Sequence, residues 1–580
     1  MSLKFLRFGA AALMAASAIS LTGCSASDSI QAGTQISIGE VRGLDSLNPD
    51  VATSLQAKAP NADLGQLTTV GFYTSDAAGN LVPNEAFGTA KVIETFPFTV
   101  SYSLSGSATW SDGTKVDATD LLLSWLSASQ SEKYGFHSIR ADSGLRYATA
   151  VPRLSTDLNS LTVQFTRPVS DWRTAIYPSV PAHLVTKRAF PSFKLDARAA
   201  KSRFVQAVNT GNKNDLTEIA KQYSGAFSLV DGHKVSTKNL VGAGPYLVAS
   251  ADAVAGVKLT ANPAFSWGNR PRVETVNVHY YDDALAMIAD IQIGKLDVAA
   301  PIESGAAQIQ EIQGLAKKAD LHFGVGLSQN IDTIQLNLRK GSVFADGTSE
   351  KTAAIREAFL LSIPVGRIAA TINIDYPVQA AKSFFYAPDD VSYPSVTKQN
   401  NSSAFAFQNL EKASQLLNSV GVDVHKPVSV RVLFNTANPR ELAVWGELSK
   451  ISKQIGFELV NSGVTDPLAH KAVGDYDAMI IEQPLFAQLG FAAVDSVDTS
   501  NFASPGFEDL AKQLGKESKA SAQKALAAKL DSALFAAGYG LPLYQTPTIV
   551  VYSRHVSGVS LSPFGNSSVW GYWNWHSSAK

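Results

Sequence analysis

Cysteine is almost absent from this chain, because Cys24 is the only one among its 580 residues. A single cysteine excludes an intramolecular disulfide and a zinc site built from several thiolates. Charge of one sign does not accumulate either: 49 Lys and Arg stand against 50 Asp and Glu, and no long basic or acidic run occurs. Proteins that follow a phosphate backbone show clustered Lys and Arg, so we expect no nucleic-acid partner.

Familiar catalytic motifs are also missing. The nine histidines stand singly without a His-x-x-x-His pair, and there is no Gly-x-Ser-x-Gly elbow. The glycine-rich stretch at 242–246 does not predict a phosphate loop, because Pro245 stands where a helix should open. We therefore expect no catalytic residues, metal ligands or cofactor. A secreted hydrolase stays the alternative, because the two carboxylates of a glycosidase have no fixed spacing in a sequence.

The first 23 residues have the features of an export signal. Lys4 and Arg7 precede an apolar run at 9–21, which is too short and too weakly apolar to make a good membrane-spanning helix. The run ends in Leu-Thr-Gly-Cys at 21–24, which resembles a bacterial lipobox. The resemblance implies that Cys24 is acylated and anchors the mature chain to the outer face of the cell membrane. A buried thiol is the alternative, but it would explain only the cysteine and neither the preceding charges nor the apolar run.

The rest of the chain mixes strand and helix patterns, and it is too long for one hydrophobic core. Alternation of apolar and polar side chains predicts strands at residues 35–39, 98–104, 161–165, 247–249, 276–280, 428–434 and 457–460. Capping residues and closing glycines predict helices at residues 117–129, 284–293, 352–362, 405–420 and 440–455. The segment 428–460 is a βαβ-like unit in this interpretation. The fold class is mixed α/β (α+β).

Four aromatic residues gather near the C-terminus: Trp570, Tyr572, Trp573 and Trp575. A sugar-stacking platform is one interpretation of such a group. Their near-alternate spacing favours a strand at the edge of a lobe, with the rings packed in the core.

Eight short segments, in order, resemble one family, the extracytoplasmic solute-binding proteins (family 5) that serve oligopeptide, dipeptide and nickel ABC importers. They are Leu47-Asn48-Pro49, 110–120 (Trp-Ser-Asp-Gly-Thr-Lys-Val-Asp-Ala-Thr-Asp), Pro181-Ala182-His183, 242–246 (Gly-Ala-Gly-Pro-Tyr), 262–265 (Asn-Pro-Ala-Phe), 294–297 (Gly-Lys-Leu-Asp), Arg356-Glu357-Ala358 and Pro542-Leu543-Tyr544. Each motif alone is weak, but together they cover nearly the whole mature chain.

The resemblance implies a two-lobed, periplasmic-binding-protein type II-like fold with an extra subdomain and a two-strand hinge. Its expected parts are a signal peptide (1–23), a tether (24–34), lobe I (35–70, 184–330 and 541–580), an extra subdomain (71–183) and lobe II (331–540). The expected crossings between lobes lie near 334–338 and 541–546. Ligand would occupy the cleft between the lobes.

The same resemblance implies a function and a set of ligand contacts. The chain would capture a peptide and deliver it, as a monomer, to the permease and ATPase of an ABC importer; a nickel complex, an oligosaccharide or another solute is the alternative. The ligand-binding candidates are Thr53, Leu55, Tyr134, Gln483, Tyr544 and Thr546.

One departure from the family pattern concerns the anchor for the amino terminus of a peptide. Many peptide-binding members follow a Tyr/Phe-Asp pair with a Trp and then an Asp, but here Gln483 and Phe486 stand in those places after Tyr476-Asp477. Glu482 could replace the missing carboxylate, or the ligand could lack a free amino terminus.

Overall fold

The computed structural model describes most of the chain after the first 28 residues. The described ranges are 29–41, 43–52, 58–77, 81–141, 143–169, 171–230, 235–252, 254–302, 305–345, 349–372, 378–388, 390–422, 425–450, 455–465, 467, 470, 474–486, 505–517, 520–562, 567 and 569–578. Cys24, the export signal, Thr53 and Leu55 lie outside them. Among the residues inside them, no helix combines the length and apolar character needed to cross a bilayer.

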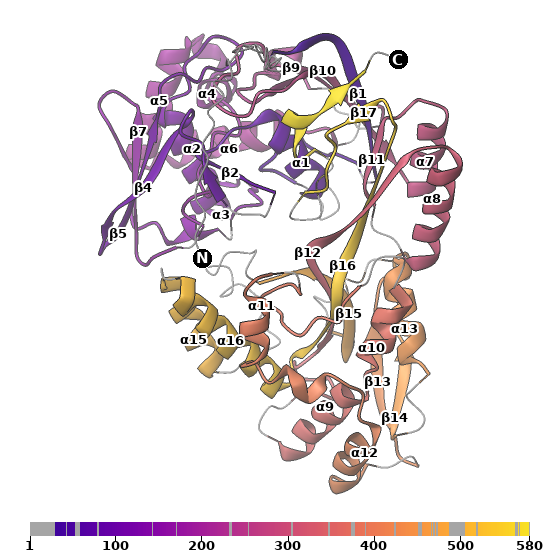
Figure 1. Ribbon diagram of the computed structural model, residues 1–580. Coiled ribbons are helices and arrows are strands. Elements are labelled where there is room, and N and C mark those ends of the chain that lie inside the picture. The colour runs from indigo at the N-terminus through magenta and orange to yellow at the C-terminus, as the bar shows by residue number, and fades with distance from the viewer. Residues whose placement is uncertain are drawn as a thin grey trace, which may run out of the picture.

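One sheet of ten strands runs through both lobes of the molecule (Figure 1). Its order is β14 (Phe457–Asn461), β13 (Val428–Leu433), β15 (Ala478–Pro484), β12 (His322–Leu336), β16 (Gly540–Tyr552), β11 (Val298–Ile302), β1 (Gln31–Val41), β10 (Val273–Tyr281), β9 (Gly256–Ala261) and β8 (Tyr246–Asp252). The upper part in Figure 1 is called lobe I below, and the lower part lobe II. The two long central strands, β12 and β16, pass from one lobe to the other.

Separate hydrophobic cores support the two lobes. The core of lobe I draws residues from 36–300 and 550–575, with a smaller cluster under α7 and α8, whereas the core of lobe II draws its residues from 331–544. The helices of lobe I are α1 (Lys58–Thr68), α2 (Ala118–Ser129), α3 (Ser131–Tyr134), α4 (Ala182–Ala189), α5 (Ala197–Thr210), α6 (Lys213–Gly225), α7 (Ala284–Gln292) and α8 (Ala306–Lys318). Those of lobe II are α9 (Glu350–Ser362), α10 (Val365–Ile372), α11 (Tyr393–Thr397), α12 (Leu410–Ser419), α13 (Pro439–Leu448), α15 (Pro505–Lys516) and α16 (Ala520–Ala537).

A second, four-stranded sheet lies in the segment expected to form the extra subdomain. Its order is β4 (Gly88–Thr95), β5 (Phe98–Leu104), β7 (Ser160–Phe165) and β6 (Arg153–Leu154). The remaining described strands form two antiparallel pairs, β2 (Tyr73–Ser75) with β3 (Leu81–Pro83) and β17 (Val556–Ser557) with β18 (His576–Ser577). The predicted lobe and subdomain boundaries stay predictions.

Two of the family motifs, 110–120 and Pro181-Ala182-His183, contact each other in lobe I. The Asp120 carboxylate accepts hydrogen bonds from the backbone N–H of Ala182 at 2.8 Å and from Trp110 Nε1 at 3.2 Å. The neighbouring His183 ring nitrogen lies 2.8 Å from the Asp112 carboxylate. These contacts tie the segment 110–120 to the Pro-x-His motif, so both motifs stabilise the fold.

Three predictions about local structure are wrong. The helix expected at 440–455 ends at Leu448, and residues 449 and 450 form a turn. The helix expected from residue 405 begins only at Leu410, because the Asn409 side chain caps it by accepting a hydrogen bond from the backbone N–H of Lys412 at 2.9 Å. The C-terminal aromatic cluster is a short 3-10 turn, Tyr572–Asn574, instead of a strand. The core packing expected for the cluster is confirmed, since Trp575 has no exposed surface and Tyr572 is buried.

Candidate functional site

The carboxyl ends of the parallel strands in one lobe point toward those in the other. β1 pairs in parallel with β10 and β11, and β13 pairs in parallel with β14 and β15. Because β16 is antiparallel to both β11 and β12, β11 runs toward lobe II as β12 does. β15 is antiparallel to β12 and therefore runs toward lobe I. In open α/β sheets ligands bind beyond the carboxyl ends of strands, so this topology places the candidate site between the lobes.

The regular pairing of β12 with β16 breaks where the two strands cross between the lobes. Leu327 pairs with Pro547 and Ile331 pairs with Gln545, so the three residues 328–330 stand opposite one, Thr546. Among the described helices and strands, extended packing between the lobes runs through these two strands. Such a break in a two-strand connection is a structural candidate for a hinge.

A group of charged and polar residues, here called the crossing cluster, surrounds this break: Asp332 on β12, Arg440 and Glu441 on α13, Glu482 on β15 and Tyr544 on β16. Arg440 Nε donates to Asp332 Oδ2 at 3.2 Å, and Arg440 Nη2 pairs with Glu482. Two further donors come from the crossing strands, Asn330 Nδ2 to Glu482 at 2.6 Å and Thr546 Oγ1 to Asp332 at 3.1 Å. One guanidinium thus connects two strands and a helix.

Burial shifts the protonation of this cluster. The Asp332 side chain has no exposed surface, and burial raises its pKa even though the Arg440 charge opposes the shift. Burial also raises the pKa of Glu441 to about 7, assisted by the charges of Asp332 and Glu482. The pKa of the Tyr544 hydroxyl is raised well above its usual value because the group is buried and lies near the charge of Asp332.

Several buried polar atoms near the crossing are short of hydrogen-bond partners within the described part of the chain. Gln483 Nε2 and Thr548 Oγ1 have none, and Asp332 Oδ1 and the Tyr544 hydroxyl have none beyond the interaction of Tyr544 with the Asp332 carboxylate itself. Most buried polar atoms in native proteins are paired, so a group of unpaired ones marks a place where another molecule can supply the partners. These four atoms come from β15, β12 and β16, and they offer both donors and acceptors.

The structure brings three of the predicted ligand contacts together. On one side of β12, Gln483 of β15 pairs with Ile331. On the other side, Tyr544 of β16 pairs with Asp332. Thr546 lies opposite the break itself and is fully buried. Tyr134 lies apart from them: it ends α3 and is 6% exposed within the core of lobe I.

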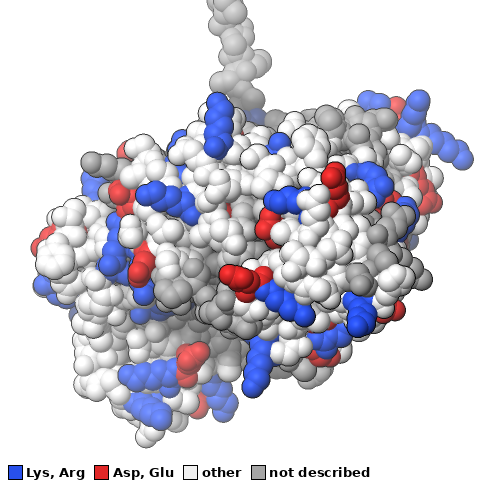
Figure 2. Space-filling view, turned by 90° about the horizontal axis from the view of Figure 1, so that it is seen from below, with Lys and Arg blue, Asp and Glu red and all other residues white. Residues whose placement is uncertain are grey.

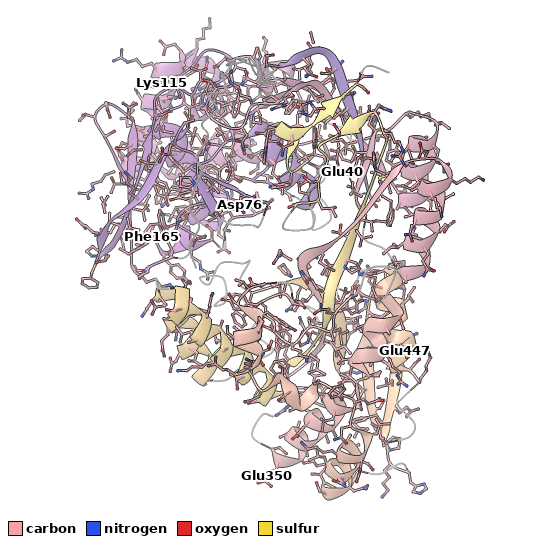
Figure 3. All side chains as sticks on the ribbon, in the orientation of Figure 1. Glu40, Asp76, Lys115, Phe165, Glu350 and Glu447 are labelled. Carbon is pink, nitrogen blue, oxygen red and sulfur yellow. The ribbon has the colours of Figure 1, made fainter. Side chains whose placement is uncertain are left out.

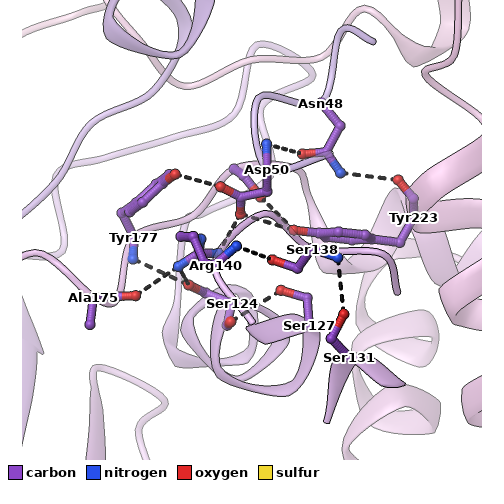
Figure 4. A network of polar contacts seen from close by, with 11 residues as sticks. Asn48, Asp50, Ser124, Ser127, Ser131, Ser138, Arg140, Ala175, Tyr177 and Tyr223 are labelled. Atoms are coloured by element: carbon purple, nitrogen blue, oxygen red, sulfur yellow. Dashed lines mark hydrogen bonds and ion pairs between the residues drawn. The ribbon is translucent and has the colours of Figure 1, made fainter. Parts of the chain in front are cut away.

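A buried network holds the loop that precedes residues 53–57 (Figure 4). The Asp50 carboxylate, with no exposed surface, accepts hydrogen bonds from Arg140, from the Tyr177 hydroxyl and, at 2.9 Å, from the Tyr223 hydroxyl. The Asn48 side chain accepts from the backbone N–H of Asp50 and donates to the Tyr223 carbonyl at 3.0 Å. The network fixes the direction in which the chain leaves the Leu-Asn-Pro motif.

The Tyr476-Asp477 pair has a structural role. Arg431 donates to both carboxylate oxygens of Asp477, at 2.8 and 3.0 Å, and the backbone N–H of Val343 donates at 3.0 Å. Although burial opposes it, these hydrogen bonds hold the pKa of Asp477 below its usual value. Asp477 therefore lies outside the crossing cluster, whereas Glu482, which is held by Arg440, belongs to it.

Sequence reasoning did not find Asp332, Arg440 and Glu441. One signal was present, because Asp332 and Glu482 are each the one carboxylate inside a strand. Arg440 carried no comparable signal, since it follows an ordinary Asn-Pro helix start.

The surface shows charges of both signs. In the view of Figure 2, Lys and Arg are interspersed with Asp, Glu and uncharged residues and form no continuous basic band. Among the described residues, no group of three or more His, Cys, Asp or Glu is placed to hold a metal ion.

Comparison with known proteins gives a consistent result. The model of the bacterial extracellular solute-binding proteins, family 5, matches residues 97–484. The oligopeptide-binding protein OppA of Mycobacterium tuberculosis is 24% identical over 539 residues, which cover 88% of this chain and 78% of OppA. An uncharacterized lipoprotein of the same species, Rv2585c, is 22% identical over 98% of this chain and 96% of its own length.

Solved structures share the fold. The periplasmic EDTA-binding protein EppA superimposes with a TM-score of 0.77 at 17% identity, covering 94% of this chain and 97% of EppA. AppA of Bacillus subtilis, in complex with a nonapeptide, has a TM-score of 0.68 at 15% identity over 94% of this chain and 99% of AppA. NikZ of Campylobacter jejuni, in complex with Ni(L-His), has the same TM-score at 16% identity and the same two coverages.

Proposed function

Because the chain belongs to family 5 of the bacterial extracellular solute-binding proteins, we propose that it captures a peptide between its lobes and delivers it to the permease of an ABC importer. Members of this family bind solutes for such importers and are not enzymes. The mixed α/β fold, with one sheet shared by two lobes, accords with that role.

The observation that carries the proposal is the group of incompletely paired, buried polar atoms where β12, β15 and β16 meet. A peptide backbone presents N–H and C=O groups at regular intervals, and it can supply partners to such donors and acceptors. We propose that Gln483, Tyr544 and Thr546 contact the cargo near the crossing and that Thr53 and Leu55 do so from lobe I. Tyr134 completes the proposed set at the end of α3.

Peptide is favoured over other solutes by the oligopeptide-binding relative, which aligns with 88% of this chain. The likeness to NikZ and EppA keeps a nickel complex or another small solute as the rival. Native mass spectrometry of the purified protein, followed by release and identification of the bound species, distinguishes the two. We expect a species with an amide backbone and a rise in melting temperature with a peptide library. A released species without amide bonds, together with no response to the library, would contradict peptide capture.

We also propose that acylation of Cys24 anchors the protein at the outer face of the membrane. The N-terminal signal pattern supports this, as does the naming of several relatives as lipoproteins. Two or more acyl chains are needed for stable anchoring. Metabolic labelling with a palmitate analogue should mark the wild-type protein and not Cys24→Ser, which should appear in the soluble fraction. Membrane retention of the unlabelled variant would count against the anchor.

A further inference from the structure

A contact beside the crossing strands also joins the two lobes. It brings Gly305, which immediately precedes α8 in lobe I, against Pro439, the first residue of α13 in lobe II. A Cβ placed on Gly305 would lie 2.9 Å from Pro439 Cβ and 3.4 Å from the Pro439 carbonyl carbon, closer than a side chain normally packs. Gly305 is buried and has a φ of −77°, which any residue adopts. Space, and not backbone conformation, therefore favours glycine at this position.

Neither side of this contact yields easily. Gly305 leads directly into α8, whose Ile309 has no exposed surface in the core of lobe I. The ring of Pro439 is fixed to the backbone, and the α13 helix after it is held by Arg440 in the crossing cluster and by Val444 in the core of lobe II. Extra volume at residue 305 would therefore move one lobe relative to the other instead of displacing a single side chain.

The crossing strands have a point at which bending costs little. The break in β12, residues 328–330, is attached to lobe II, because the backbone N–H of Leu485 donates to the Gln329 carbonyl at 3.0 Å. On the side of lobe I, the last regular pair before the break is Leu327 with Pro547, and a proline offers no N–H to the ladder. Lobe II and the break can thus turn together about the pair Leu327–Pro547.

The contact and the facing surfaces of the lobes lie on opposite sides of the crossing strands. In Figure 1, α8 and α13 lie to the right of β12 and β16, whereas α11, α15 and α16 of lobe II lie to the left of them. A turn that brings α15 and α16 toward lobe I moves Pro439 away from Gly305. The reverse turn presses these two residues together, so the contact opposes opening and leaves closure free.

We propose that the contact between Gly305 and Pro439 is an opening stop, and that these two positioning residues influence the affinity for cargo without touching it. This inference rests on the proposed function, because it requires the cargo to be held between the lobes and to favour their closed arrangement. A larger residue at position 305 destabilises the most open arrangements, so a larger fraction of the cargo-free protein is closed. The apparent affinity rises by the same factor as the fraction of the protein that is competent to bind.

The test measures the distance between the lobes in mature protein from which bound solute has been removed by unfolding and refolding. Thr149→Cys in lobe I and Lys512→Cys on α15 place spin labels at two exposed positions, and Cys24→Ser removes the native thiol. Pulsed electron spin resonance then gives the distribution of distances between the labels. Gly305→Ala should raise the population of short distances, and Pro439→Gly, which removes the opposing Cβ, should raise that of long distances.

Two further variants serve as controls. In the double variant, Gly305→Ala with Pro439→Gly, the added Cβ has room, so the distribution should return toward that of the wild type. Gly314→Ala adds the same methyl group to α8 where it meets nothing within 4 Å, and it should leave the distribution unchanged. Melting temperatures establish that each variant is folded.

Affinity is measured with the tightest-binding member of a synthetic peptide library. Gly305→Ala should bind this peptide about three-fold or more tightly than the wild type, and Gly314→Ala should bind it equally well. Distances that are unchanged or longer in folded Gly305→Ala would overturn the opening stop and leave solute capture intact. If Gly305→Ala does not fold, an unchanged distribution in Pro439→Gly overturns the stop equally. If no peptide binds and the purified protein retains no solute, the proposed function fails, and the distances still decide whether the stop exists.

Discussion

At the scale of the residue, buried charges in this protein depend on specific partners. Asp50 has no exposed surface and receives hydrogen bonds from Arg140, Tyr177 and Tyr223, which come from three separate segments of lobe I. Removing one member of a buried ion pair leaves the other charge without compensation. The network therefore stabilises the loop before residues 53–57 only while it is complete.

Asp50→Asn should lower the free energy of unfolding by about 3–5 kcal/mol, because the Arg140 guanidinium would remain buried without a counter-charge. Urea denaturation followed by circular dichroism measures this. As a control, Asp320→Asn breaks a pair with Arg554 in which both side chains are more than half exposed, and should cost less than about 1 kcal/mol. Similar losses in the two variants would show that the Asp50 network is not the stabilising element inferred here.

Asp531 should make stability depend on pH. Burial raises its pKa to about 7, although Ser383, Asn400 and the backbone N–H of Phe384 donate hydrogen bonds to it. The folded protein then holds a proton that the unfolded chain releases, so this group's contribution to stability falls as the pH rises from about 4 to about 7. The melting temperature of Asp531→Asn should fall less than that of the wild type between about pH 5 and about pH 8. Parallel pH profiles of the two proteins would contradict this assignment.

At the scale of the element, several contacts between helices, strands and loops require two backbone segments to approach closely. Gly244, in the Gly-Ala-Gly-Pro-Tyr motif, packs against the last residue of α1: a Cβ there would lie 2.2 Å from the carbonyl carbon of Thr68 and 2.4 Å from its oxygen. No side chain fits in that space, so the glycine is required by packing between the loop and the helix.

Gly244→Ala should therefore destabilise the protein strongly, since the Thr68 backbone cannot move without displacing α1. Gly314→Ala is the matched control: a Cβ on this residue of α8 would meet nothing within 4 Å, and alanine favours a helix by about 0.5–1 kcal/mol over glycine. The two substitutions should thus shift the melting temperature in opposite directions. A shift in the same direction for both would show that the close approach at Gly244 does not constrain the fold.

Local patterns predicted elements well where one face of the element is buried. The strand at 98–104 and the helix ending at 129 appear as β5 and α2, because alternation and an Asp117 cap are visible over a few residues. The helix predicted from residue 405 begins later because its start depends on the Asn409 cap. The strand predicted for the C-terminal aromatic cluster does not form because Gly571, with φ of +80°, turns the chain at that point. Regular spacing alone did not reveal these turns.

The candidate site was only partly predictable. Gln483, Tyr544 and Thr546 followed from the family resemblance, and the structure places them on β15 and β16, the two strands that flank β12. Arg440 joins Asp332 and Glu482 from positions 108 and 42 residues away in the chain, and no periodicity connects such positions. Only the sheet order of β15, β12 and β16 shows that they form one cluster.

At the scale of the whole molecule, two lobes with separate cores share one sheet through β12 and β16. Figure 3 shows Asp76 of lobe I at the margin that faces lobe II and Glu350 at the far end of lobe II. Bending at the break between Leu327 and Ile331 would change the distance between the lobes while leaving both cores intact.

Cargo should shift the protein toward a closed arrangement of the lobes, because only that arrangement allows both lobes to contact the solute. Small-angle X-ray scattering of the mature protein should show a smaller radius of gyration with saturating cargo than without it. A peptide that does not bind serves as the control. An unchanged radius at saturation would mean that capture occurs without movement at the crossing.

A crystal structure of the protein with the solute that it retains through purification would test capture between the lobes most directly. We predict that the solute lies between the lobes at the crossing of β12 and β16, with polar atoms within hydrogen-bonding distance of Gln483 and Tyr544. A solute bound elsewhere on the molecule, or bound to one lobe without reaching the crossing, would contradict capture at this site.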